Sequence, residues 1–425
     1  MNKLNFLLLV LLVLLTDACG KQNIKPVTVK HQGPTQTTAC DCVNSSSNKP
    51  ADITPVQLPE SRPTSGSKPI DTPKIADYSL LKPAKWDEID GLNQDDLTQA
   101  WPAWIQGCST LINTPAWKSA CTAANSVKGT SNYAINIYYK KYFTPYLTNN
   151  ADGTDTGLIT GYYEPLLNGS RHQSVQTPYP LYSLPTDLVT VELADIYPDL
   201  KFKRVRGKLV GNKVLPYYTR AEIEAVPSPL QGHELMWIDD IIDVFFLQIQ
   251  GSGLVQLENG EQVHVGYADQ NGYTYNSIGR LLVERGELTL DQASMQGIKN
   301  WTRNNLDKLR DLLNSNPSYV FFRELPANLP GPIGALGVPI IAQRVVAIDP
   351  KYIPLGAPVF LSTNQPNSTA PLKRLMMAQD TGGAIKGGVR ADFFWGAGNE
   401  AGKQAGAMKQ KGKIWVLLPK EFVFK

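Results

Sequence analysis

Residues 375–395 read LMMAQDTGGAIKGGVRADFFW, and this pattern guides the interpretation of the folded part of the chain. Two apolar runs within it, Leu375–Ala378 and Gly388–Trp395, predict short β-strands because glycines and polar turn residues bound them. Between the runs, Asp380 stands at the end of the first strand, directly before two glycines that let a backbone approach a ligand closely. Since Asp and Gly are also common turn residues, the stretch indicates either a carboxylate site or an ordinary turn.

Further helices and strands are expected on both sides of this stretch. From Tyr78 to about Thr160 apolar residues recur at helical spacing, whereas beyond Gly161 short β-like runs are separated by Gly, Pro and Asn. We expect strands at Tyr179–Leu184, Leu209–Tyr218, Leu254–Leu257, Gln262–Tyr267, Ile340–Ile348, Ala357–Leu361 and Ile414–Leu418. We expect helices at Ser131–Phe143, Ile238–Gln250, Ser277–Arg285, Asp291–Asn314 in two parts, and Asn399–Gln410. For the last helix, Asn399 is the expected N-cap and Gly412 lies just past its end. The pattern predicts an α+β fold, mainly β with helices, around a small barrel or sheet.

Composition excludes several classes of protein. The 425 residues, at about 150 per domain, predict two to three domains. Lys and Arg number 41 and Asp and Glu 38, a formal net charge of +3 that is too balanced for a protein whose main partner is nucleic acid. The four His and five Cys show none of the close spacings that gather metal ligands, so metal catalysis is disfavoured and no cofactor is expected.

The N-terminus has the features of an export signal. Lys3 precedes ten consecutive apolar residues, Phe6–Leu15, about half of what a membrane-spanning helix needs. A small residue before Cys19 resembles a bacterial lipoprotein signal, which predicts cleavage after residue 18 and a lipid on Cys19. Thr16 and Asp17 match that signal poorly, so an ordinary secretory signal that releases a soluble periplasmic protein stays the alternative.

A disordered tether is predicted at residues 19–76, which are rich in Pro, Ser and Thr. Such a segment buries too little apolar surface to offset the entropy of ordering. Cys40 and Cys42 lie within it and are interpreted as an unstructured pair. Cys108 and Cys121 lie where the chain is expected to fold, so a disulfide between them is reasonable, although spacing alone does not fix it.

Four strings of sequence point to a known family when they are considered together. They are GYYEP (161–165), FFLQIQGSG (245–253), NPSYVFFR (316–323) and AQDTGGAIKG (378–387). In this order and at comparable separations they resemble the membrane-bound lytic murein transglycosylase A family, over about residue 95 to the end. The resemblance implies an enzyme that cleaves peptidoglycan glycan strands between N-acetylmuramic acid and N-acetylglucosamine and leaves 1,6-anhydromuramic ends.

The resemblance also implies a domain arrangement and a location. A double-psi β-barrel catalytic domain should combine residues 77–162 and 321–425, and a smaller inserted β-barrel domain should span 163–320, with a groove between the two. The protein should be anchored by lipid at the periplasmic face of the outer membrane. Its expected partners are peptidoglycan glycan strands and, as a second class, other cell-wall enzymes, with no nucleic acid.

The family's catalytic aspartate corresponds to Asp380 in this chain. A hydroxyl of the substrate itself, on C6, acts as nucleophile, so one acid can first protonate the glycosidic oxygen and then accept the hydroxyl proton. To hold a proton near neutral pH, this carboxyl needs burial or a nearby carboxylate such as Asp349 or Asp392. The residues expected to bind substrate are Tyr162, Tyr163, Gln250, Ser252, Gly382, Gly383, Lys386, Asp392 and Asp349.

Simpler interpretations and rival functions stay open. Tyr162, Tyr163 and Trp395 are equally typical of a protein core, and a lysine such as Lys386 is more often only solvated. Glu164 departs from the residue that other family members carry, so no role is assigned to it. A glycoside hydrolase would pair Asp380 with a second acid, and a non-catalytic glycan-binding protein would release no product.

Overall fold

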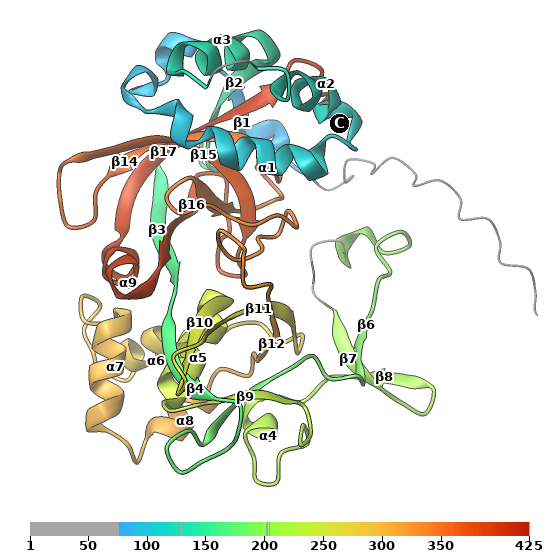
Figure 1. The fold of residues 1–425 in the computed structure, drawn as a ribbon, viewed down its shortest axis with the longest axis vertical. Coiled ribbons are helices and arrows are strands. Elements are labelled where there is room, and N and C mark those ends of the chain that lie inside the picture. The colour runs from blue at the N-terminus through green and yellow to red at the C-terminus, as the bar shows by residue number, and fades with distance from the viewer. Residues whose placement is uncertain (1–75, 128–129, 201–202, 204, 425) are drawn as a thin grey trace, which may run out of the picture. The chain divides into compact units, whose positions relative to one another are not determined.

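A β-barrel of six strands lies at the centre of the part of the chain that carries the C-terminus (Figure 1). The computed structural model describes residues 76–127, 130–200, 203 and 205–424, and within them the strand order is β17–β14–β15–β13–β16–β3, with β3 pairing back to β17. The barrel strands are β3 (Gly157–Glu164), β13 (Val345–Ile348), β14 (Pro358–Asn364), β15 (Pro371–Thr381), β16 (Arg390–Ala397) and β17 (Lys409–Pro419). Two pairs are parallel, β13–β15 and β16–β3, and the others are antiparallel. The predicted α+β fold with a closed barrel is confirmed.

The register of this barrel brings two acidic residues to one place. Strand β13 is buried at all four positions because β15 and β16 flank it. Ala347 of β13 pairs with Asp380 on one side and with Asp392 on the other. The two carboxylates, twelve residues apart in sequence, therefore lie two strands apart at the same level of the barrel.

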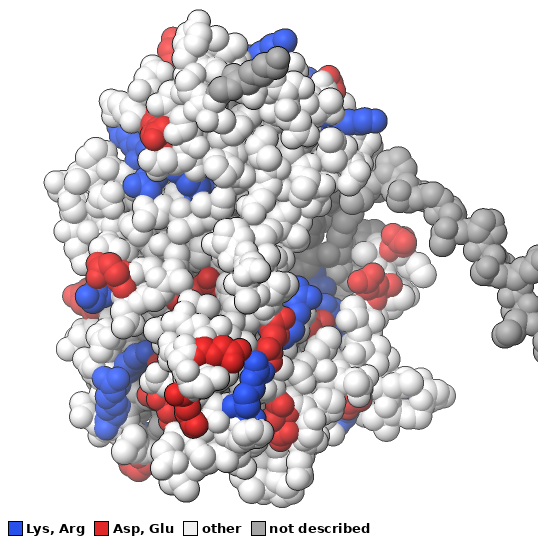
Figure 2. Space-filling view, in the orientation of Figure 1, with Lys and Arg blue, Asp and Glu red and all other residues white. Residues whose placement is uncertain are grey.

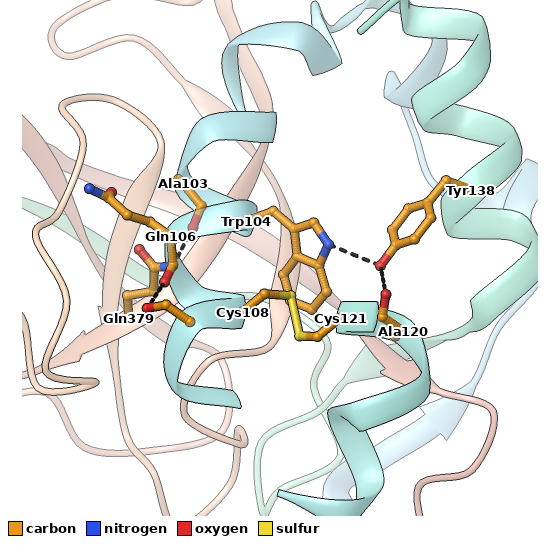
Figure 3. The surroundings of a disulfide bond; sticks show 9 residues. Ala103, Trp104, Gln106, Cys108, Ala120, Cys121, Tyr138 and Gln379 are labelled. Carbon is orange, nitrogen blue, oxygen red and sulfur yellow. Dashed lines mark hydrogen bonds between the residues drawn. A yellow bond between two sulfur atoms is a disulfide. The ribbon is translucent and has the colours of Figure 1, made fainter. Parts of the chain in front are cut away.

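Three helices and a disulfide cover one end of the barrel (Figures 1 and 3). They are α1 (Trp101–Leu111), α2 (Pro115–Ala124) and α3 (Asn132–Tyr142), accompanied by β1 (Leu81–Pro83), β2 (Phe143–Thr148) and the 3₁₀ turns Tyr78–Leu80, Trp86–Glu88, Leu92–Gln94 and Leu97–Gln99. A Cys108–Cys121 disulfide joins α1 to α2. Trp104 donates to the Tyr138 hydroxyl at 3.0 Å, and Tyr138 donates to the carbonyl of Ala120 at 2.7 Å. These bonds connect all three helices.

A second, smaller sheet follows β3 in the chain. Its order is β12–β11–β10–β4–β9–β5, and a bridge between Ser183 and Phe322 brings the region of its two edge strands together, as expected for the inserted barrel. The strands are β4 (Leu166–Ser170), β5 (Tyr179–Tyr182), β9 (Glu234–Ile238), β10 (Ser252–Leu257), β11 (Gln262–Gln270) and β12 (Val320–Glu324). Their inward-facing apolar residues, among them Met236, Val255 and Phe322, form a separate core.

The inserted segment also carries short helices and a small third sheet. The helices are α4 (Arg220–Ile223), α5 (Ile241–Gln250), α6 (Ile278–Glu284), α7 (Met295–Asn304), α8 (Leu309–Asn314) and the 3₁₀ turn Pro198–Leu200. The sheet consists of β6 (Leu188–Thr190), β7 (Arg206–Val210) and β8 (Lys213–Leu215). Positive and negative side chains are interspersed on the face drawn in Figure 2.

Several predicted element boundaries were wrong. The helix expected from Ile238 begins at Ile241, because Ile238 ends β9 and the Asp240 carboxylate caps the helix by accepting from the Ile242 N–H at 2.7 Å. The helix expected to start after an Asn399 cap, α9, spans Gly398–Ala407 instead. Gly412, expected just past that helix, lies in β17 and pairs with β3.

The other differences are of the same kind. The single strand expected from Leu209 is a hairpin of β7 and β8. The helix expected in two parts from Asp291 is confirmed as α7 and α8, although it begins at Met295. No helix in the described ranges is long and apolar enough to cross a membrane. The predicted signal, Cys19, and all of the predicted tether except residue 76 lie outside the described residues.

Candidate active site

Residues of both barrels line a groove of about 460 Å³, which is the groove referred to below. The first barrel contributes Tyr162 of β3 and the segment 380–384 at the end of β15. The second contributes residues 248–252, where α5 passes into β10, and Arg323 of β12. A glycine-rich loop at 332–337 supplies a further part of the wall. The groove therefore contains segments of all four strings that carried the family resemblance.

Asp380 lines this groove and accepts hydrogen bonds from Thr381, Ala335 and Tyr162. Its Oδ1 accepts a hydrogen bond from the N–H of the next residue, Thr381, at 2.9 Å and another from the Ala335 N–H at 3.1 Å. Its Oδ2 accepts from the Tyr162 hydroxyl at 2.8 Å. Gln379, the residue before it, is fully buried and donates to the carbonyl of Ala103 in α1 at 2.6 Å. The carboxylate is thus fixed by its strand, by the 332–337 loop and by β3.

Tyr162 serves as a hydrogen-bond donor to that carboxylate. Its ring is buried against Phe394, with 5.1 Å between the ring centroids. Burial, and then the negative charge of Asp380, hold the pKa of the Tyr162 hydroxyl well above its usual value. The hydroxyl therefore keeps its proton at physiological pH and donates to Asp380. The sequence had placed Tyr162 among the sugar-binding residues, and no pattern in it indicated this bond.

Asp392 lies behind the groove, on the far side of Ala347 from Asp380. Burial raises the pKa of Asp392 to about 6, and the charge of Asp380 adds to the rise, while a hydrogen bond from Thr160 and the charge of Arg390 oppose it. The Thr160 hydroxyl donates to Asp392 Oδ1 at 2.5 Å and itself accepts from Arg390 at 2.9 Å. Asp392 is not one of the described residues that line the groove.

The loop after Asp380 is anchored at its far end by Asp349. Gly382 and Gly383 line the groove, whereas Asp349 is buried away from it and its Oδ2 accepts from the Gly387 N–H at 3.0 Å. The Lys386 ammonium is 4.0 Å from Asp349, and its side chain is 60% exposed. Of the described residues, neither Lys386 nor Asp349 lines the groove.

Gln250 and Ser252 are brought to the groove by a tight helix-to-strand transition. Helix α5 ends at Gln250, Gly251 takes the left-handed conformation with φ of 85°, and β10 starts at Ser252. Both residues line the groove, and Gln250 Oε1 accepts from the Tyr163 N–H at 3.1 Å. The Tyr163 side chain is directed elsewhere, since its hydroxyl contacts the sulfur of Met295 at 3.5 Å.

Sequence reasoning missed several groove residues. Arg323 was quoted within a family string but given no role, and the 332–337 loop carried only the signal of dense Gly and Pro. Arg220 lines the groove from α4 yet is almost fully buried. Glu164, whose role was open, is buried and its Oε1 is 2.5 Å from Nε2 of His264. In the described part of the chain, no three His, Cys, Asp or Glu side chains are grouped so as to hold a metal ion.

Comparison with known proteins gives consistent results for sequence and structure. Residues 158–323 match the family model described as the MltA specific insert domain, and residues 344–418 match the 3D domain. The chain is 33% identical over 275 residues to membrane-bound lytic murein transglycosylase A of Escherichia coli strain K12, covering 63% of this chain and 67% of that protein.

Solved structures extend the similarity to nearly the whole of the related chains. The crystal structure of MltA from Neisseria gonorrhoeae in its monoclinic form is 36% identical, with a TM-score of 0.70, over 81% of this chain and 93% of that one. The lytic transglycosylase LtgG of Burkholderia pseudomallei is 44% identical, with a TM-score of 0.53, over 80% of this chain and 96% of that one.

Proposed function

The chain belongs to the membrane-bound lytic murein transglycosylase A family, and from that premise we propose that Asp380 is the single acid with which it cleaves peptidoglycan glycan strands. The protein is a lytic transglycosylase, a lyase that acts on peptidoglycan. The bond cleaved is the β-1,4 bond between N-acetylmuramic acid and N-acetylglucosamine. The product carries a 1,6-anhydromuramic end.

One observation supports a single acid. Asp380 is the only Asp or Glu among the described residues that line the groove. A hydrolase of the usual kind needs a second carboxylate to activate water or to attack the sugar, whereas an intramolecular hydroxyl needs neither. The second acid nearest in register, Asp392, lies beyond β13 and is bonded to Thr160.

The contacts of Asp380 suggest how the proton moves. Two backbone N–H groups hold Oδ1, whereas Oδ2 accepts from the hydroxyl of Tyr162, and we assign the moving proton to Oδ2. That proton passes to the glycosidic oxygen as the bond from this oxygen to C1 breaks, and the bonding electron pair stays with the oxygen. The C6 hydroxyl oxygen of the same muramic acid then bonds to C1, and its proton returns to Oδ2. The acid is regenerated and no water is consumed.

Other residues of the groove hold the glycan strand. Gln250, Ser252, Gly382 and Gly383 line the groove and supply polar side chains and open backbone to sugar hydroxyl and acetamido groups. Tyr162 holds the acid in place instead of stacking on a ring. We assign the catalytic barrel to residues 77–164 and 325–425 and the insert to 165–324, which shifts the expected boundaries by a few residues so that β3 stays whole in the first barrel and β12 in the second.

The anchoring of the protein is part of the same proposal. A lipid on Cys19 would hold the enzyme at the periplasmic face of the outer membrane, and residues 19–76 would give the catalytic part reach toward the cell wall. Radiolabelled palmitate incorporation in cells tests the anchor, with Cys19→Ala as the variant that should lose the label. Label that persists in this variant would refute lipidation at Cys19.

Product analysis tests the cleavage. Purified protein is incubated with sacculi in isotopically labelled water, and the released muropeptides are measured by mass spectrometry. Unlabelled anhydromuramic ends are expected, whereas incorporation of labelled oxygen would indicate hydrolysis and no release would indicate a binding protein. Asp380→Asn should bind sacculi normally and lose about a hundred- to ten-thousandfold in rate. Asp239→Asn, an acid of the insert outside the groove, is the matched control.

A further inference from the structure

Arg323 places a positively charged side chain in the groove, where the described residues supply it with no hydrogen-bond or ion-pair partner. Arg323 is on β12, on the face away from Phe322, whose ring belongs to the core of the second barrel. It is exposed and lines the groove. Within the described residues its guanidinium makes no ion pair and no hydrogen bond.

The neighbours of Arg323 leave its guanidinium open. The residue paired with it on β11 is Gly266, so no side chain from that strand covers it. The adjacent acid, Glu324, forms a two-bond ion pair with Arg171 instead. The positive charge of Arg323 is therefore not neutralised from either of these positions.

Two other cations of the described residues, Arg220 and Lys386, are occupied or lie outside the groove. Arg220 donates to Glu224 at 3.0 Å and to the carbonyl of Ser318 at 2.7 Å, and its guanidinium packs on the Phe245 ring at 4.7 Å. Its charge is thus used in holding the insert together. Lys386, which the sequence suggested as a carboxylate contact, stands beside Asp349 and outside the groove.

We propose that Arg323 binds a carboxylate carried by the muramic acid substituent of peptidoglycan. This inference rests on the proposed function and adds a determinant of substrate class to it. The planar guanidinium fork matches a carboxylate, and such charge-assisted bonds are among the strongest that a groove can make. Peptidoglycan carries carboxylates on its stem peptides, or on the lactyl group once the peptide is removed, whereas a chitin oligosaccharide carries none. Arg323 therefore favours peptidoglycan over neutral glycans.

Binding measurements on three ligands test this assignment. The full chain with Asp380→Asn, which blocks cleavage, is titrated with glycan strands bearing stem peptides, with strands stripped of peptides, and with a chitin oligosaccharide. Arg323→Gln is compared with Arg323→Lys and with Arg280→Gln, which removes the same charge from an exposed position on α6. Circular dichroism and the thermal midpoint confirm that each variant is folded.

The expected result separates the ligands. Arg323→Gln should weaken binding of carboxylate-bearing strands by about tenfold and leave the chitin oligosaccharide unchanged, while Arg323→Lys should retain part of the affinity and Arg280→Gln all of it. A loss with peptide-bearing strands assigns the stem peptide, and a loss with stripped strands assigns the lactyl carboxylate. Unchanged binding of both charged ligands, or an equal loss with the chitin oligosaccharide, overturns the assignment. Failure of the cleavage proposal is distinct, since it is read from the products of the wild-type protein.

Discussion

The hydroxyl of Tyr162 donates a 2.8 Å hydrogen bond to Oδ2 of Asp380, although the two residues are 218 positions apart in the chain. They stand on β3 and β15, which are separated by β16 and β13 in the barrel order. The bond therefore spans the end of the barrel that faces the groove. It reaches the oxygen to which the mechanism assigns the moving proton, so Tyr162 acts as a positioning residue for the acid.

Removal of that hydroxyl should slow the chemistry without changing binding. We expect Tyr162→Phe to lower kcat by about 10- to 100-fold with little change in KM, because a hydrogen bond to a charged group is worth about 1.5–3 kcal/mol. Turnover of sacculi measured across pH checks this, and a shift in the pH profile would separate positioning from a loss of packing. Tyr163→Phe is the control, because its hydroxyl contacts Met295. Equal rates for both variants would refute the role of Tyr162.

The raised pKa of Asp392, about 6 against a usual 3.8, predicts a pH dependence of folding stability. Between about pH 4 and pH 6 the folded protein holds a proton that the unfolded chain has lost, so the stability from this residue is present below that window and lost as pH rises through it. The loss should amount to about 3 kcal/mol, since each unit of pKa shift is worth about 1.4 kcal/mol. Free energies of unfolding, measured by denaturant at several pH values, should vary less in Asp392→Asn. The same pH dependence in both proteins would contradict the assignment.

Much of the fold follows from local sequence pattern. The runs around Asp380 and Asp392 formed strands as predicted, because short apolar runs and the glycines that bound them act over a few residues. Boundaries failed where a tertiary partner decided them. Residues 408–412 carry no strong local signal against helix, yet pairing of residues 409–412 with β3 ends α9 at Ala407.

Residues of the site could be predicted from the sequence only where they lie within one of the family strings. Asp380 was identified because a family string surrounds it, and Gln250 and Ser252 for the same reason. The hydrogen bond from Tyr162 to Asp380, and the position of Asp392 on the other side of β13 from Asp380, depend on which strands are neighbours. No local sequence pattern carries that information. Arg323 was overlooked because an arginine on a strand gives no sign of whether an acid will pair with it.

The disulfide between Cys108 and Cys121 should contribute measurably to stability (Figure 3). It closes a segment of 13 residues between two buried positions, for which restriction of the unfolded chain predicts about 3 kcal/mol. Denaturant unfolding of the Cys108→Ala, Cys121→Ala double variant should show a loss of this order, beyond that of the small change in packing. The Cys40→Ala, Cys42→Ala double variant serves as the control, and an equal effect in the two would argue against the prediction.

The 332–337 loop offers a test of how closely the acid must be held. A Cβ at Gly334 would lie 2.6 Å from the carbonyl oxygen of Gln379 and 2.7 Å from the side chain of Ile340. Gln379 cannot easily move, because its side chain is bonded to α1, so the loop must shift and carry the Ala335 N–H away from Asp380. We expect Gly334→Ala to lower kcat by about tenfold or more, through the loss of one hydrogen bond to the carboxylate.

A glycine without neighbours provides the matched comparison. Nothing lies within 4 Å of a Cβ built at Gly406, which is inside α9. Gly406→Ala should therefore leave turnover unchanged and stabilise the fold by about 0.5–1 kcal/mol, the usual gain of alanine over glycine in a helix. Turnover of sacculi and denaturant unfolding of both variants check the pair. Wild-type turnover in Gly334→Ala would mean that the bond from Ala335 is not needed, and the 332–337 loop would then lose its place in the mechanism.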